Sequence, residues 1–220
     1  MKKIIPFILS MCIISMAQAQ LTKSSPVLKP IMQKPKGNAD NNQQTAPSTP
    51  TVNDADYFLS VAKVTIKTGK DNKEQNSKLI VSVYPASGTD NWKKGFTMEN
   101  YMPELKVWSS QDFTLPKAPD FDRAFNSLAR YKQTGVMVDI LYNTMGNGPF
   151  FLTDAWKIEE ISATLEFKDM NGNPHPTMPS KTIYFYGSNN DMYLDFGKWH
   201  LYCKTDEYFN VLPTFITKRP

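Results

Sequence analysis

The feature that most constrains the fold of this chain is a set of short runs with an apolar residue at every second position. Val64 and Ile66 follow this pattern, and so do Leu79, Val81 and Val83. Successive side chains of a strand point to opposite faces of a sheet, so each run predicts a strand with one face on a core. The segment "TGKDNKEQNS" between them carries a glycine and many turn-forming polar side chains, which is ordinary loop chemistry.

Similar runs recur through residues 54–220, rich in β-branched and aromatic residues and separated by Gly, Pro, Asn and Asp. Strands do not alternate regularly with helices, and no fixed repeat stands out. The sequence therefore predicts a mainly β fold, an antiparallel β-sandwich. We expect strands over residues 57–67, 77–84, 105–108, 135–142, 158–167, 182–186, 192–194, 198–202 and 211–216.

One short inserted helix is predicted between these strands. Asp120 is a suitable N-cap, and Phe121, Phe125 and Leu128 form an apolar stripe at helical spacing. Gly135 is suited to end the helix.

The first 19 residues have the pattern of a secretory signal peptide. Two lysines precede an apolar run over residues 4–16, and Ala17-Gln18-Ala19 has the small-x-small form of a cleavage site. The apolar run is too short to span a membrane, so we expect an exported chain without a transmembrane segment, periplasmic or extracellular. Lipid attachment at Cys12 is an alternative, although Met11 precedes it where small residues are preferred.

Residues 20–53 are rich in Pro, Gln, Asn, Ser and Thr and contain few large apolar side chains. Such a segment cannot offset its ordering entropy by burial, so it is predicted to be a disordered linker. Three parts follow: a signal peptide over 1–19, a linker over 20–53 and a β-sandwich domain over 54–220.

Charge and cysteine content exclude several classes of protein. Loss of Lys2 and Lys3 with the signal peptide lowers the formal net charge from +4 to +2, and the remaining lysines are scattered among acids. We therefore expect no nucleic-acid partner. Cys203 would be the one cysteine of the processed chain, so an internal disulfide cannot form and stability must come from a core.

Oxygen-bearing side chains suit calcium, the one cofactor that the sequence suggests. The predicted ligands lie in the loop after Gly69: Asp71, Asn72, Glu74 and Asn76. Carbonyl groups, water or a neighbouring loop such as that of Asp154 would have to complete the shell. The segment "DMNGNP" at residues 169–174 also carries alternating oxygens, but it lacks the spacing of an EF-hand and is predicted to be a turn.

The opening of the domain resembles the PLAT (lipoxygenase-homology) family. The resemblance lies in a strand, Thr68-Gly69, a polar loop, Ser77 and a second strand, and again in "WKIEEISATLEF", where Trp156 and the following apolar residues match that family's tryptophan strand. "GVMVDILYN" takes the place of the strand before it. The resemblance covers about residues 57–167, with an insertion around residues 100–132. It implies a non-catalytic sandwich that contacts protein or lipid through loops at one end.

Two other functions compete with this interpretation. A carbohydrate-binding module would present some of the aromatic residues as an exposed row: Trp92, Trp108, Tyr184, Tyr186 and Trp199. A divergent hydrolase would need Cys203 beside His200 or His175, with Asp206 or Asp195 as the orienting acid. Residues 200 and 203 fall on opposite faces of the predicted strand, so direct pairing is disfavoured. We therefore expect a binding module for protein, lipid or glycan and no enzyme.

Overall fold

Two antiparallel sheets and one short α-helix build the domain in the computed structural model, which describes residues 52–75, 77–88, 91–143, 155–187, 192–195 and 197–218. These residues belong to one unit over residues 49–220. The predicted signal peptide and nearly all of the predicted linker lie outside the described residues. At the linker's predicted end, the Asn53 side chain accepts a hydrogen bond from the Ala55 amide and caps η1 (Asp54–Asp56).

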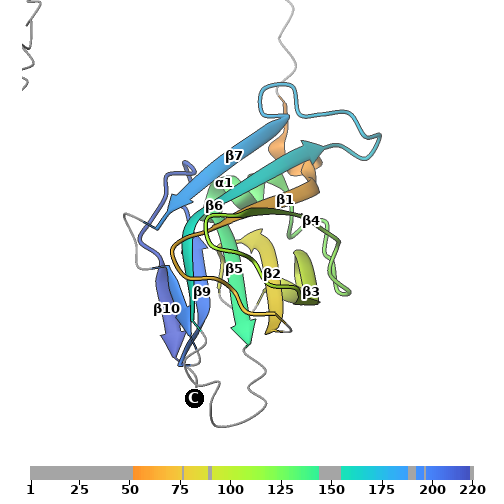
Figure 1. Cartoon of the computed structure of the whole chain (residues 1–220). Helices are drawn as coiled ribbons and strands as arrows, with labels where there is room; N and C mark the ends of the chain where they lie inside the picture. Colours follow the sequence, from red (N-terminus) through yellow and green to blue (C-terminus); the bar gives the residue numbers. More distant parts are fainter. Residues whose placement is uncertain are drawn as a thin grey trace, which may run out of the picture. The chain divides into compact units, whose positions relative to one another are not determined.

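Both sheets have antiparallel neighbours throughout (Figure 1), which confirms the predicted fold class. In the first sheet the strand order is β4-β1-β6-β7, and β8 also pairs with β6. Its strands are β1 (Phe58–Thr68), β4 (Ser110–Leu115), β6 (Ala155–Lys168), β7 (Ser180–Tyr186) and β8 (Tyr193–Asp195). In the second sheet the order is β10-β9-β5-β2-β3. Its strands are β2 (Ser77–Pro85), β3 (Phe96–Met102), β5 (Val136–Asn143), β9 (Lys198–Lys204) and β10 (Phe215–Lys218).

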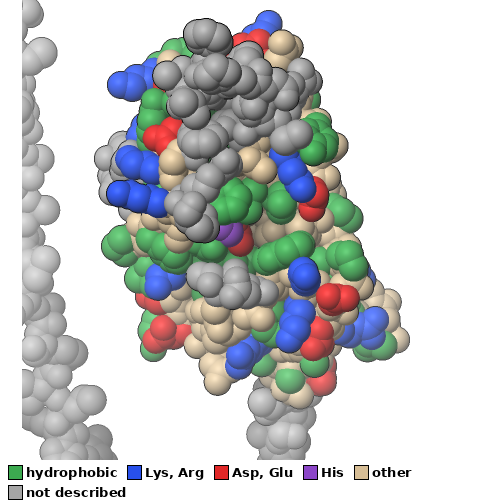
Figure 2. Space-filling model, turned by 90° about the horizontal axis from the view of Figure 1, so that it is seen from below, with side chains coloured by type: hydrophobic (Ala, Val, Ile, Leu, Met, Phe, Trp, Pro, Cys, Tyr) green, Lys and Arg blue, Asp and Glu red, His purple; other side chains and the backbone are tan. Residues whose placement is uncertain are grey.

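Basic and acidic side chains are interspersed on the face of the domain shown in Figure 2, with hydrophobic side chains between them. Among the described residues visible there, the two charge signs are not separated into patches. Among the described residues, no helix has the length and apolar character needed to cross a membrane.

The core lies between the two sheets, because one face of each inner strand is apolar. Val64, Ile66, Leu79, Val81 and Val83 are all fully buried, as the alternation predicts. Other members of the core include Leu59, Val138, Ile140, Tyr142, Leu165, Phe167, Phe185 and Leu201.

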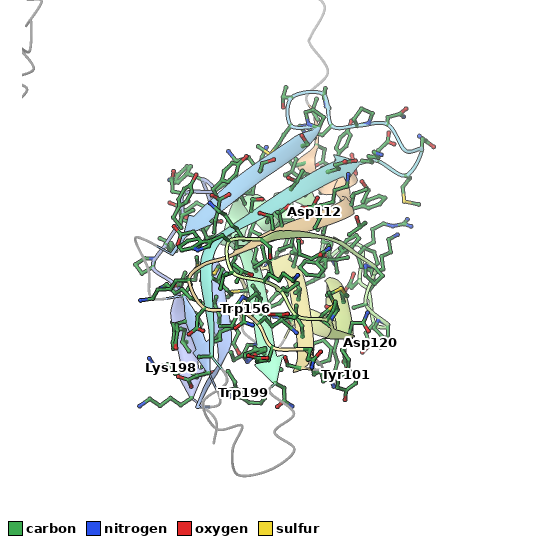
Figure 3. All side chains as sticks on the ribbon, in the orientation of Figure 1. Tyr101, Asp112, Asp120, Trp156, Lys198 and Trp199 are labelled. Atoms are coloured by element: carbon green, nitrogen blue, oxygen red, sulfur yellow. The ribbon has the colours of Figure 1, made fainter. Side chains whose placement is uncertain are left out.

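Trp156 is a fully buried member of this core and lies in the interior of the domain (Figure 3). Its indole nitrogen donates to the Thr68 hydroxyl at 3.3 Å, so its polar atom is satisfied. The β1–β6 pairing shifts between Lys67 and Thr68, opposite Glu160 and Ile158. This bulge at Glu159 keeps Ile158 and Ile161 on the core side.

Two strand predictions need correction. Residues 105–108 form no strand, because Leu105 makes an isolated bridge to Lys73 and Trp108 has a φ of 59°, which a strand does not accommodate. The last strand begins at Phe215 instead of at residue 211. Strands β3 and β4, which no prediction covered, are edge strands. Only the first two residues of β3 are buried and four of the six residues of β4 are exposed, so the apolar alternation is short.

The helix begins later than predicted. α1 spans Leu128–Thr134, with Ser127 as N-cap and Gly135 at the C-terminal end. Residues near Asn126 cannot be helical because they pair with the start of β1: the Leu59 amide donates to the Asn126 carbonyl and the Leu128 amide to the Tyr57 carbonyl. Gly135 has a φ of 79°, and a Cβ there would lie 2.1 Å from the Thr205 carbonyl oxygen. Only glycine fits this position.

Candidate functional site

Two loops lie together at the end of the sandwich where β1 ends and β2 begins. Residues 69–76 join β1 to β2, and residues 103–109 join β3 to β4. We call the described residues 69–75 and 103–109 the loop end. Lys73 and Leu105 exchange backbone hydrogen bonds of 3.1 and 2.9 Å, and the Trp108 amide donates to the Gly69 carbonyl at 3.2 Å. The two loops are therefore fixed to each other.

Gly69 is required where the first loop leaves β1. A Cβ at this position would lie 2.9 Å from Lys157 Cγ and 3.2 Å from the Lys157 carbonyl oxygen. The Gly69 amide also donates to that carbonyl at 2.6 Å. Close approach of two backbones thus explains the Thr-Gly pair on which the PLAT resemblance depends.

A lysine ammonium group holds the loop end together from inside. Lys73 is fully buried, and its Nζ donates to the Glu74 carbonyl oxygen at 2.8 Å and to Ser77 Oγ at 3.2 Å. It also donates to the Met102 and Pro103 carbonyl oxygens, each at 3.3 Å. A buried charge is tolerated only when it is well hydrogen-bonded, so these oxygens are organised around Lys73.

The four predicted calcium ligands have separate surroundings. Asp71 Oδ2 accepts a hydrogen bond from the Tyr193 hydroxyl at 3.0 Å, and Asn72 donates to Glu104 Oε1 at 2.8 Å. Glu74 is exposed, and Asn76 lies outside the described residues. Within the described part of the chain, no three His, Cys, Asp or Glu side chains are placed to hold a metal ion. The calcium site stays a prediction.

The segment "DMNGNP" forms the predicted turn. Asp169 accepts hydrogen bonds from the Asn171 and Asn173 amides at 2.9 and 2.8 Å and from the Asn173 side chain at 2.9 Å. The Asn173 side-chain hydrogen bond is the largest cause that lowers the pKa of Asp169. Gly172 supplies the positive φ of 84° that the turn needs.

The second loop presents adjacent apolar side chains to solvent. Val107 is 47% exposed and Trp108 is 61% exposed. Lys70 and Lys106, both exposed, lie in the same two loops. Backbone strain accompanies this arrangement, because a tryptophan in the left-handed region is rare. Sequence reasoning took 105–108 for a strand and so missed the presentation of Trp108.

The aromatic residues predicted for sugar binding do not form one row. Tyr184 and Tyr186 are exposed on β7, and their rings are nearly parallel, at 9°, with centroids 6.2 Å apart. Trp92 instead packs against the buried residues of the second sheet's outer face. Trp108 belongs to the loop end, and Trp199 is half-buried.

The candidate nucleophile and the histidines lie apart, as the strand pattern predicted. Cys203 is buried in the core, and burial raises the pKa of its thiol, with Asp139 adding to the effect. His200 lies on the opposite face of β9 and forms a hydrogen bond with Asp139. His175 bonds Asp54 at 3.0 Å. A protonated, buried thiol without a histidine beside it has little nucleophilic character.

A polar network missed by sequence reasoning lies on the outer face of the second sheet. Asp139 Oδ2 accepts from the Tyr84 hydroxyl at 3.0 Å, and Asp139 Oδ1 bonds His200 Nε2. The other ring nitrogen of His200 lies 2.9 Å from the Tyr202 hydroxyl. Tyr84, Asp139 and Tyr202 are all buried. An aspartate inside the apolar run "GVMVDILYN" was the signal available in the sequence.

Comparison of the chain with protein-family models, curated proteins and solved structures gives no match.

Proposed function

We propose that the protein is an exported, non-catalytic β-sandwich module, periplasmic or extracellular, that binds a lipid surface through its loop end. The observation that carries this proposal is the exposed pair Val107 and Trp108 on a loop fixed by hydrogen bonds. The resemblance to the PLAT family, which implies contact through loops at one end of a sandwich, supports the same proposal.

Rigidity of the loop end favours binding. Leu105 is buried, and the Ser109 carbonyl accepts from the Thr68 amide at 2.8 Å, so both sides of the Val107–Trp108 pair are attached to the sandwich. A preorganised apolar group loses little conformational entropy when it enters a partner surface. The strain at Trp108 is consistent with a side chain retained for contact instead of for stability.

The chemistry of the loop end suits a membrane interface. Tryptophan is enriched at the boundary between lipid head groups and acyl chains because its ring is amphipathic. Lys70 and Lys106 are exposed in the same loops and could reach lipid phosphates, each adding about 1 kcal/mol on an anionic membrane, whereas the exposed Glu74 and Glu104 act against them.

Vesicle binding tests the proposal. The processed chain (residues 20–220) should bind vesicles of phosphatidylcholine with phosphatidylglycerol in a flotation assay. Trp108→Gly should weaken binding by about tenfold or more, because an aromatic side chain contributes roughly 1.5–3 kcal/mol when it leaves water. The same change should not destabilise the domain, since glycine relieves the positive φ.

Matched variants distinguish binding through the loop end from nonspecific adsorption to vesicles. Tyr208 is 75% exposed outside the loop end, so Tyr208→Ser should leave vesicle binding unchanged. Lys70→Gln with Lys106→Gln should weaken binding to anionic vesicles only. Equal binding by wild type and Trp108→Gly would refute the role of the loop end. Absence of vesicle binding by the wild type would refute a lipid surface and leave a protein as the partner of the same apolar pair.

Carbohydrate binding is a second candidate, favoured by the exposed parallel rings of Tyr184 and Tyr186. Polar side chains continue from Tyr184 across the first sheet, because Ser162 lies opposite Tyr184 and Thr65 lies opposite Ser162. Affinity electrophoresis against a panel of polysaccharides would test this: retardation that Tyr184→Ala abolishes supports a sugar site, and unretarded migration on every polysaccharide excludes it.

A further inference from the structure

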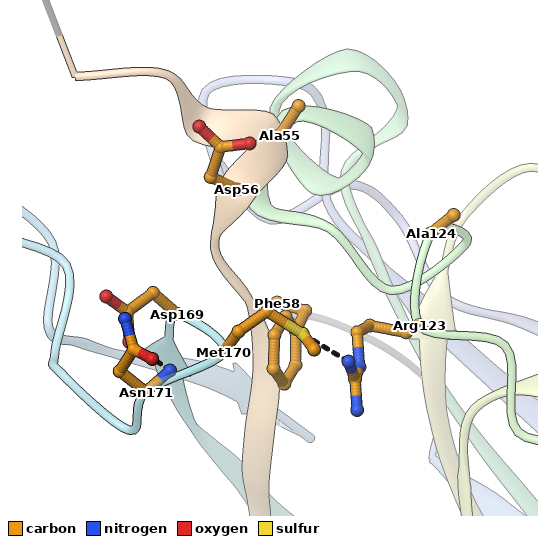
Figure 4. A pocket seen from close by; sticks show the side chains of 8 residues that line it. All are labelled: Ala55, Asp56, Phe58, Arg123, Ala124, Asp169, Met170 and Asn171. Carbon is orange, nitrogen blue, oxygen red and sulfur yellow. Dashed lines mark hydrogen bonds between the residues drawn. The ribbon is translucent and has the colours of Figure 1, made fainter.

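A pocket of about 530 Å³ opens at the start of β1, whereas the loop end follows the last residue of β1. Four apolar residues line it together with four polar ones: Ala55, Phe58, Ala124 and Met170, and Asp56, Arg123, Asp169 and Asn171. The residues come from η1, β1, the segment before α1 and the turn after β6 (Figure 4). Six of the eight lining residues are exposed, and Phe58 and Asp169 are partly buried, so the pocket is an open hollow on the surface.

Arg123 provides the positive charge of the pocket. Its guanidinium group lies over the Phe58 ring, with Cζ 4.6 Å from the centroid, and one of its nitrogens donates to the sulfur of Met170. Figure 4 shows the three side chains side by side. A thioether is a weak acceptor and a guanidinium carries five N–H donors, so most of its capacity is available to a ligand. Among the described residues no carboxylate forms an ion pair with Arg123.

The two acids that line the pocket form no ion pair with Arg123, although together they outnumber its single positive charge. Both carboxylate oxygens of Asp169 accept hydrogen bonds from its own turn, which keeps the pKa of this group low. Asp56 extends from η1 in a direction away from Arg123 in Figure 4. Both acids still repel negative charge, so a ligand with one negative charge is favoured over a dianion such as phosphate.

We infer that this pocket binds a small monocarboxylate that carries an apolar group. The carboxylate would accept paired hydrogen bonds from Arg123, the geometry that guanidinium groups prefer. The apolar group would lie against Phe58 and Met170, which form the walls beside it. Contact with Phe58 orients the guanidinium plane before the ligand arrives, which lowers the entropic cost of binding.

Calorimetric and NMR titration of the processed chain with 3-phenylpropionate tests the inference, with 3-phenylpropanamide as the uncharged counterpart. Saturable binding of the carboxylate is expected below about 10 mM, with amide shifts confined to the pocket residues. Arg123→Gln should weaken binding by about tenfold or more, since a charge-assisted hydrogen bond is lost. Arg130→Gln is the matched control, because Arg130 bonds Gln133 on α1 and does not line the pocket.

Four outcomes would overturn the inference: no saturable binding by the wild type, equal affinity in Arg123→Gln, equal affinity for the amide, or an equal loss in Arg130→Gln. A thermal unfolding curve of each variant distinguishes loss of the ligand from loss of the fold. Because the pocket and the loop end share no residues, failure of one proposal leaves the other standing.

Discussion

The outer faces of the two sheets differ although both consist of alternating strands. On the first sheet, Thr65, Asp112 and Ser162 lie side by side and reach solvent. On the second, Ser82 and Asp139 lie opposite each other and are buried. Trp92 and Phe125 pack over this second face together with Ala86, and all three are partly buried. Polar side chains on a covered face must complete their hydrogen bonds within the protein, so the same residue type has a different energetic role on each sheet.

Replacement of the two outer aspartates should show the largest difference. Asp139→Ala removes the partner of both Tyr84 and His200, and should cost about 3–5 kcal/mol because a buried pair is broken. Asp112→Ala removes one exposed hydrogen bond from Thr65 and should change stability by about 0.5 kcal/mol or less. Urea unfolding of both variants measures the contrast. Equal losses would mean that the two faces are not energetically distinct.

Removal of a tyrosine hydroxyl should have a smaller effect in the same direction. Tyr84→Phe leaves one oxygen of Asp139 without its donor and should cost about 1.5–3 kcal/mol. Tyr184→Phe is the counterpart on the first sheet, where the hydroxyl is exposed, and should leave the unfolding midpoint unchanged. If Tyr84→Phe left the free energy of unfolding unchanged, the Asp139 carboxylate would have to accept its hydrogen bond from another donor.

Cross-strand hydroxyl pairs provide a third comparison. Thr97 Oγ1 lies 3.1 Å from Ser82 Oγ and 2.8 Å from the Trp92 carbonyl oxygen on the covered face. Thr164 and Thr182 have their hydroxyls 3.0 Å apart on the solvated face. Thr97→Val should cost about 1 kcal/mol, whereas Thr182→Val should be close to neutral. Thermal unfolding of the two valine variants decides this, and a greater loss in Thr182→Val would contradict it.

The smallest effect is expected from two equivalent turns, one after β6 of the first sheet and one after β9 of the second. Asp169 and Asp206 each accept two backbone amides and an asparagine side chain four residues later, from Asn173 and Asn210. That side-chain bond is the largest cause that lowers the pKa of each aspartate. Each turn therefore adds stability above the unfolded pKa of about 3.9 and loses it as the pH falls through the lower folded value.

Asp169→Asn and Asp206→Asn should each reduce the acid sensitivity of unfolding below about pH 4. The free energy of unfolding, measured from pH 2 to pH 6, should fall less steeply with decreasing pH in each variant than in the wild type. An unchanged slope in both variants would contradict the role of the two turns, because both aspartates are partly buried and their carboxylates accept hydrogen bonds from their own turns.

The strands next to the core were predictable, and the covered outer face was not. Val81 and Val83 alternate strongly because one side meets the core, so β2 was located within one residue. Strand β3 is buried only at its first two residues and has no comparable pattern, so it was missed. Alternation shows that one face is apolar, but it does not show whether another segment covers the second face. Such cover depends on residues far apart in the sequence, as when Phe125 packs against the cluster that contains Tyr84.

The position of the first loop of the loop end was predictable, but that of the second loop and the chemistry of both were not. Thr68-Gly69 and the polar residues after it located a loop at a strand exit. Lysine in a polar loop is usually solvated, and nothing local to "KDNKEQ" indicates that Lys73 turns inward to carbonyl groups of residues 102 and 103. Exposure of Trp108 depends on a positive φ, which a tryptophan rarely adopts, so sequence patterns favour a strand there.

Because Lys73 is buried, the rate at which its side chain is chemically modified reports how often the loop end opens. An amine-acylating reagent can modify this Nζ only while the loop is open, whereas the exposed Lys70 reacts at all times. The ratio of the two modification rates therefore reports the equilibrium between the closed and open loop without any unfolding of the sandwich. Since each acylation also removes the charge that the carbonyl oxygens surround, an opened loop would be trapped open, and the modified protein would accumulate in proportion to time.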